Sequence, residues 1–109
     1  MIGFNKSFNI IEKYKEELLF KYKELYPKMK IEEKKEFLGK FEEKVGYIQK
    51  QVEHMNAEIY FVENELERES YQSQITVCQT YVTQLQVTLL SEKQKNMDYT
   101  IFDENEKRR

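Results

Sequence analysis

The chain has 109 residues, of which 35% are charged and 39% hydrophobic, and it contains eight tyrosines, seven phenylalanines, three glycines and one proline. This length provides for one small domain, and the aromatic content excludes a disordered segment. The formal net charge of −2 excludes a general electrostatic attraction to nucleic acid or anionic lipid.

The only cysteine, Cys78, excludes an internal disulfide and fits a reducing, cytosolic setting. The N-terminal segment carries charge too early for a signal peptide. No uncharged apolar run approaches the ~20 residues needed to cross a bilayer. We therefore expect a soluble domain.

The first predicted element is a helix over about residues 4–26. Its apolar residues recur at steps of three and four, which is the period of one helical face. Pro27 cannot lie inside a helix and disfavours helical geometry at Tyr26, so a turn containing Met29 should follow. The apolar stripe consists of Phe4, Phe8, Ile11, Leu18, Tyr22, Leu25 and Met29.

A second helix is predicted over residues 31–62. Glutamates near its start suit the positive end of a helix dipole. Gly39 and Gly46 interrupt this helix one heptad apart, either as tolerated glycines on the solvent side or as a face that lets another backbone come close. Its stripe is Leu38, Phe41, Val45, Ile48, Val52, Met55, Ile59 and Val62.

The stretch YQSQITVCQTYVTQLQVTLLS, residues 71–91, carries no charge. Alternating Val, Ile and Tyr would suit a strand, whereas Tyr71, Ile75, Cys78, Val82, Leu85 and Leu89 follow the heptad. The length decides, because strands rarely exceed ~10 residues and no turn signal breaks this run. We therefore predict a third helix over about residues 67–92, with residues 93–109 as a polar tail or linker.

The junction between the second and third helices contains neither Gly nor Pro. One unbroken helix from Ile31 to Leu90 is therefore the structural alternative. The stripe changes phase after Leu66, which favours a turn near Asn64, with Ser70 as a candidate cap. Three helices with one apolar stripe each predict an all-α fold, an antiparallel up-down-up three-helix bundle.

The sequence offers little chemistry for catalysis. His54 is the only histidine and has no cysteine nearby, and Cys78 falls on the inward stripe, where it reads as a small buried hydrophobe. Pairs such as Glu32–Glu33 and Glu42–Glu43 read as solvated helix faces with lysines one turn away. We predict no catalytic, cofactor or metal site and no enzyme activity.

Surface contacts with a protein are the remaining expectation. Five apolar residues lie off the stripes, and they either form partner-binding surface or merely widen the core. Residues 51–70 carry six acidic groups and one basic group, which is either a patch for a basic partner or a solvated helix end and turn. The five candidate partner-binding residues are Phe20, Tyr47, Phe61, Val77 and Val87.

The segments FNIIEKYKEELLFKYKEL and IEEKKEFLGKFEEKVGYIQKQVEHMNAEI resemble a known family pattern. Over about residues 8–90 the chain is similar to the N-terminal regulatory (Habc-type) domain of the Vti family of Qb-SNAREs, which act in vesicle transport by interacting with t-SNAREs. The residues that carry the resemblance are Tyr14, Glu16, Glu32, Glu33, Lys34, Lys35, Leu38, Phe41, Glu42, Lys44, Met55, Glu58 and Ile59.

The resemblance implies a regulatory domain that binds other SNARE proteins or an ENTH-type clathrin adaptor. It places the parent protein on the cytosolic face of Golgi and endosomal membranes, anchored by a C-terminal segment that this sequence lacks, and the domain as a monomer. The alternative is a coiled-coil assembly or tethering protein of the prefoldin kind, which the breaker-free junction after Val62 would suit.

Overall fold

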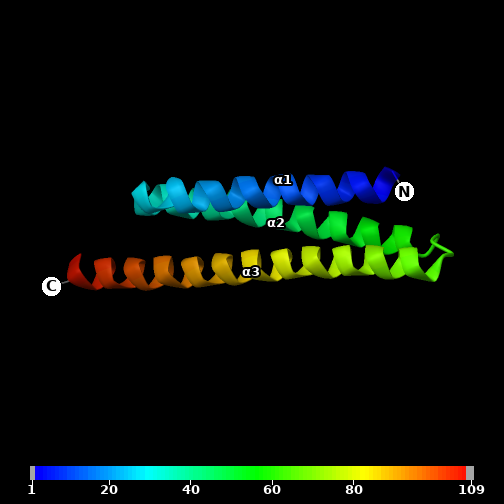
Figure 1. The fold of residues 1–109 in the computed structure, drawn as a ribbon. Helices are drawn as coiled ribbons and strands as arrows, with labels where there is room; N and C mark the ends of the chain where they lie inside the picture. The colour runs from blue at the N-terminus through cyan, green and yellow to red at the C-terminus, as the bar shows by residue number, and fades with distance from the viewer. Residues whose placement is uncertain (1, 108–109) are drawn as a thin grey trace.

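The computed structural model describes residues 2–107, and these form three long α-helices and one short 3₁₀ turn (Figure 1). Helix α1 spans Ile2–Glu24, the 3₁₀ element η1 spans Tyr26–Lys28, α2 spans Ile31–Ile59 and α3 spans Glu65–Lys107. No strand occurs in this part of the chain. The predicted all-α, up-down-up three-helix bundle is therefore confirmed.

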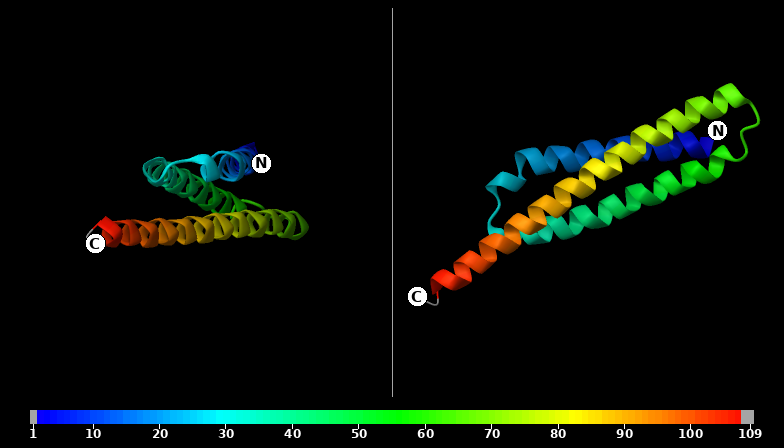
Figure 2. Two further views of the ribbon diagram at one scale, coloured as in Figure 1. Left: turned by 90° about the vertical axis from the view of Figure 1, so that its left-hand side faces the viewer. Right: turned by 90° about the horizontal axis from the view of Figure 1, so that it is seen from below.

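The helices lie lengthwise in a slender molecule of 68 × 19 × 16 Å. The α1–α2 connection lies at one end, and the α2–α3 turn lies at the other, beside the N-terminus (Figure 1). Since α3 has 43 residues and α2 has 29, the C-terminal end of α3 projects past the other two helices (Figure 2).

The three stripes meet in one core. Phe4, Ile11, Phe41, Ile48 and Met55 are at most 1% exposed, and α3 adds Ile75, Cys78, Val82, Leu85 and Leu89 from the charge-free stretch. That stretch is thus helical, as its heptad period predicts. The stripe of α1 ends differently from the prediction, because Leu25 is 46% exposed whereas Tyr26 is 4% exposed. The helix stops at Glu24, and the 3₁₀ turn around Pro27 rotates Tyr26 inward.

The chain turns back at residues 60–64, so the alternative of one unbroken helix from Ile31 to Leu90 is wrong. The prediction that α2 reaches residue 62 is also wrong, since α2 ends at Ile59. Asn64 caps α3, because its Oδ1 accepts a hydrogen bond from the Glu67 N–H at 3.0 Å. Ser70, the other candidate cap, lies inside the helix.

The prediction of a tail or linker over residues 93–109 fails for the described part, because α3 continues to Lys107. The heptad positions that follow Leu89 are occupied by polar residues, so the apolar stripe fades while the helix goes on. Asn96 is 7% exposed and donates a hydrogen bond to the Tyr26 hydroxyl at 3.3 Å. A polar contact with η1 therefore replaces the apolar contacts made earlier along α3.

Candidate interaction surfaces

Three surfaces of the bundle leave apolar groups uncovered, and they are named here the outer face, the groove and the tip. The outer face runs along α3 away from the core. The groove lies between the start of α2 and the end of α3, and the tip is the α2–α3 turn. The groove and the tip lie at opposite ends of the long axis (Figure 1).

The outer face is exposed and carries no charge over two and a half heptads. It consists of Ser73, Thr76, Val77, Thr80, Thr83, Gln84, Val87 and Ser91. The hydroxyls of Thr76, Thr80 and Thr83 each donate to the backbone carbonyl four residues earlier, at 3.0 Å. Because these donors are already satisfied, the face presents mainly methyl groups, which lose little hydration when another surface covers them.

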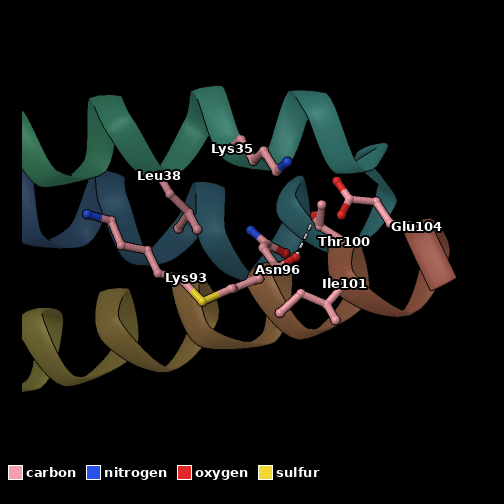
Figure 3. A pocket seen from close by; sticks show the side chains of 8 residues that line it. Lys35, Leu38, Lys93, Asn96, Thr100, Ile101 and Glu104 are labelled. Carbon is pink, nitrogen blue, oxygen red and sulfur yellow. Dashed lines mark hydrogen bonds between the residues drawn. The ribbon is translucent and has the colours of Figure 1, made fainter.

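The groove has a volume of about 520 Å³ and is lined mostly by apolar surface. Leu38 of α2 forms its floor together with Met97 and Ile101 of α3, which are 58% and 51% exposed. Lys35 and Glu104 stand at its outer end and Lys93 at its inner end (Figure 3). Lys93 also makes an ion pair with Glu42 at 2.6 Å, which ties α3 to α2. The volume falls within the ~300–1,000 Å³ typical of binding pockets.

The tip exposes three large apolar side chains, since Tyr60 is 84%, Phe61 81% and Leu66 78% exposed. Three hydrogen bonds define its backbone, from the N–H groups of residues 60, 61 and 62 to the carbonyls of Ala57, Glu58 and Ile59. The Arg68 guanidinium clamps the turn by donating from Nε and Nη2 to the Val62 carbonyl, at 3.2 and 2.6 Å. The tip therefore holds its aromatic pair on an ordered support.

Beside the groove, a polar cluster joins α1, η1 and α3. The Tyr22 hydroxyl donates to Glu92 Oε1 at 2.7 Å, and Lys95 donates to the same oxygen at 3.3 Å. Burial, followed by the hydrogen bond to Glu92, raises the pKa of Tyr22 to about 12. Burial alone would raise the pKa of Glu92, but the hydrogen bonds from Tyr22 and Lys95 outweigh it and lower that pKa. The cluster fixes where α3 packs against the end of α1.

The structure does not bring the five candidate partner-binding residues together. Phe20 is 63% exposed on α1, and Phe61 is part of the tip. Tyr47 of α2 is 43% exposed and packs edge-on against Tyr14 of α1, with 5.4 Å between ring centroids. Val77 and Val87 share the outer face. All five are exposed, so the alternative that they widen the core is wrong, while their binding role stays a prediction.

Sequence reasoning missed the groove and most of the tip. Met97 and Ile101 fall in the segment predicted as a tail or linker, and Tyr60 and Leu66 are not among the five candidate partner-binding residues. The only sequence signal for the groove was the short apolar island near residues 99–102, where Tyr99, Ile101 and Phe102 are all more than half exposed. An island of this kind in a polar segment indicates an uncovered helix face.

The two residues considered for chemistry are poorly placed for it. His54 is exposed at the side of the bundle, and Cys78 is completely buried. Burial, with a smaller contribution from the negative charge of Glu12, raises the pKa of the Cys78 thiol to about 11. Within residues 2–107, no group of three or more His, Cys, Asp or Glu side chains is arranged to hold a metal ion.

None of the described helices is both long and apolar enough to cross a membrane. No family model, no curated protein and no solved structure matches this chain.

Proposed function

We propose that the chain is a non-catalytic protein-interaction module, and that it serves as the N-terminal regulatory domain of a SNARE protein in vesicle transport. The outer face of α3 carries the proposal. In a chain that is 35% charged, this face has no charge from Ser73 to Ser91, and a solvated helix face would ordinarily be rich in Lys and Glu.

The need to form a stable helix does not explain why the outer face is composed of threonine, valine, serine and glutamine. Threonine and valine are weaker helix formers than Ala, Glu or Lys, and at exposed positions their packing does not compensate. Threonine hydroxyls that bond back to the helix also weaken it slightly. A face that sacrifices helix propensity and avoids charge is typical of a surface that another helix covers.

The family part of the proposal is supported by the resemblance around residues 32–59 and by the three-helix architecture that it implies. Four of the residues that carry the resemblance, Leu38, Phe41, Met55 and Ile59, are buried core residues of α2. These four residues therefore stabilise the bundle, whereas the exposed outer face is the surface that we propose binds the partner. The expected partners are helical SNARE segments or an ENTH-type clathrin adaptor, at the cytosolic face of Golgi or endosomal membranes.

Calorimetric titration against SNARE-motif peptides and against an ENTH domain tests this function. Replacing Val77 and Val87 by lysine places two charges on the outer face at exposed positions and should weaken binding at least tenfold, because the charges must be desolvated. The control is Leu19→Lys, an apolar residue of α1 that is 41% exposed, close to the 43% of Val77, and this variant should bind as the unmodified chain does. Binding to neither partner would contradict the proposal.

A coiled-coil assembly or tethering protein is the second candidate. The observation that favours it is the projection of α3 beyond the rest of the bundle (Figure 2), with Met97, Tyr99, Ile101 and Phe102 more than half exposed. Sedimentation velocity on dilution separates the two functions, since a chain that reaches the monomer supports the regulatory domain and an elongated dimer that persists supports the assembly protein.

A further inference from the structure

We propose that copies of this chain associate head to tail, with the tip of one copy seated in the groove of the next. This inference goes beyond the proposed function, since it needs no SNARE partner, and it departs from the monomer expected from the sequence. It rests on two observations, an exposed apolar tip with glutamates around it and an apolar groove with lysines beside it.

The tip has an apolar centre and an acidic rim. Tyr60, Phe61 and Leu66 are each more than three-quarters exposed, although turn positions are ordinarily filled by Gly, Asn, Asp, Ser or Pro. Glycine is not required in this turn, because none of the described residues has a positive φ. Between Glu58 and Glu69 the chain has five glutamates and one arginine, and that arginine, Arg68, is engaged with the Val62 carbonyl.

The opposite end has an apolar groove in basic surroundings. Between Lys21 and Lys35, which includes η1 and the start of α2, the chain has six lysines and three glutamates. Lys35 and Lys93 line the groove itself, together with one acidic residue, Glu104 (Figure 3). Of these two lysines, Lys93 is already paired with Glu42, so Lys35 is the one that faces the groove without an ion pair among the residues that the structure describes. On the far side of Asn96, a second hollow is lined by Lys30, Lys34 and Lys95, and by Glu92, which accepts a hydrogen bond from Lys95. The acidic rim of a tip would thus meet lysines on both sides of the end of α3.

The groove is large enough for the tip. Its volume of about 520 Å³ lies in the range of pockets that hold drug-sized ligands, so the Phe61 ring and a neighbouring apolar side chain would fit. The clamp on the Val62 carbonyl keeps the tip in one conformation, which reduces the entropy lost on binding. A contact made by so few residues is of the small, transient class.

The tip and the groove lie at opposite ends of the rod (Figure 1). A contact between two different surfaces of the same chain does not close on itself by a two-fold axis. Each added copy therefore leaves one free tip and one free groove, and the assembly grows into a chain of copies rather than stopping at a dimer.

Sedimentation velocity with two variants tests this geometry. The tip variant is Tyr60→Ser with Phe61→Ser, and the groove variant is Met97→Gln with Ile101→Gln. All four residues are more than half exposed, and neither variant changes the charge, so circular dichroism should show the helical content of the unmodified chain. Val77→Ser, at an exposed position on α3 between the tip and the groove, is the control.

For the unmodified chain and the control, the sedimentation coefficient should rise with protein concentration and exceed that of a dimer. The rise should be less steep at high salt, because salt screens the charges of the acidic rim and of the lysines. Each end variant alone should remain a monomer, since it has lost one of the two surfaces. An equimolar mixture of the two variants should form a dimer and nothing larger, because only one intact tip and one intact groove can meet.

Three results would overturn the proposal. The first is a monomer at every concentration up to about 1 mM, at which a contact worth only ~4 kcal/mol would already be half formed. The second is association that survives in either end variant. The third is a mixture of the two variants that fails to dimerise. As an independent check, a Phe61→Cys chain mixed with an Ile101→Cys chain should form a disulfide-linked heterodimer faster than either chain links to itself.

Discussion

Tyr22 and Glu92 are 70 positions apart in the sequence and 2.7 Å apart in the fold. The hydroxyl donates to the carboxylate, so the neutral form of Tyr22 is the one that the fold favours. The stacked ring of Tyr26, 5.3 Å away between centroids, and the Asn96 amide complete the contact between the end of α1 and α3. Polar groups that satisfy one another in this way define a register more sharply than apolar contacts do.

We expect Tyr22→Phe to lower the free energy of unfolding by about 1–2 kcal/mol at pH 7, since Glu92 loses a hydrogen bond. The pKa of Tyr22 is raised in the folded state, from about 10 to about 12. Its stabilising contribution is therefore complete below pH 10 and is lost as the pH rises from 10 to 12.

Urea denaturation at pH 7, 10, 11 and 12 measures this effect. The stability of the unmodified chain should fall more steeply above pH 10 than that of Tyr22→Phe, whereas lysine titration affects both chains equally. Parallel curves for the two chains would show that the Tyr22–Glu92 hydrogen bond does not contribute to stability.

Cys78 should react with thiol reagents only when the bundle opens. It is completely buried, and its pKa of about 11 keeps it protonated at neutral pH, whereas the thiolate is the reactive form. Labelling with a disulfide reagent at pH 8 should be at least a hundredfold slower in the native protein than in urea. Equal rates would place Cys78 at the surface and contradict the packing of α3.

Helix α2 makes the most extensive contacts with both of the other helices, and it contains two glycines whose small size the packing does not require. A Cβ atom added at Gly39 or Gly46 would meet nothing within 4 Å. Both glycines therefore belong to the solvent side, which confirms one of the two sequence interpretations and excludes a close backbone approach at these positions.

Gly39→Ala and Gly46→Ala should each raise the free energy of unfolding by about 0.5–1 kcal/mol, because alanine loses less backbone entropy in a helix. Urea midpoints measure the gain, and the two gains should add. Gly3→Ala is the matched comparison and should gain less, since its Cβ would come within 2.9 Å of Glu58 Oε1. A loss of stability at Gly39 or Gly46 would indicate a contact with another molecule on that face.

Helix α3 has two regions with different supports. From Tyr71 to Leu89 it contributes apolar residues to the core, and from Glu92 to Asn96 it is held by polar contacts with the end of α1 and with η1. Beyond this point its exposed apolar residues have only the groove side of α2 nearby. A helical segment as short as residues 97–107 is marginal in water when it is isolated, so the end of α3 depends on the rest of the helix and on the contacts around the groove.

At the scale of the whole molecule, one continuous core should make the three helices unfold together. Ile48→Ala removes a fully buried side chain and should lower the free energy of unfolding by about 2–5 kcal/mol. Val87→Ala, at a position that is 61% exposed, should change it by less than about 0.5 kcal/mol. Circular dichroism in urea should show one transition for both variants, and separate transitions would contradict a shared core.

The shape of the molecule gives it two distinct ends. Its length of 68 Å is more than three times its width of 19 Å. The acidic stretch of residues 58–69 lies at the α2–α3 turn, and the lysine-rich stretch of residues 21–35 lies at the opposite end, to which the end of α3 adds the acidic Asp98 and Glu104 (Figure 1). The net charge of −2 conceals this separation, because it averages over the whole rod. This arrangement of charges is one basis of the head-to-tail association proposed above.

Hydrophobic periodicity was sufficient to predict the three helices, their antiparallel order and nearly every core residue. These features depend on local spacing, since steps of three and four place residues on one helical face whatever packs there. The turn near Asn64 could be predicted for the same reason, because a change of phase in the stripe has to be absorbed by a break in the helix. The positions of Phe20, Tyr47, Phe61, Val77 and Val87 off the stripes left open whether they are exposed or widen the core, and the packing of the helices decides that they are exposed.

Tertiary structure alone decided the length of α3, the choice of Tyr26 over Leu25 in the core, and the groove. In the sequence alone, Asn96 has the character of an exposed tail residue. In the fold it is buried and bonded to Tyr26, which lies 70 positions earlier in the chain. The burial of a polar side chain depends on a partner that satisfies it, and such a partner can come from any part of the chain. The separation of the tip from the groove likewise depends on how α2 and α3 pack against each other, which the spacing of residues along the chain does not determine.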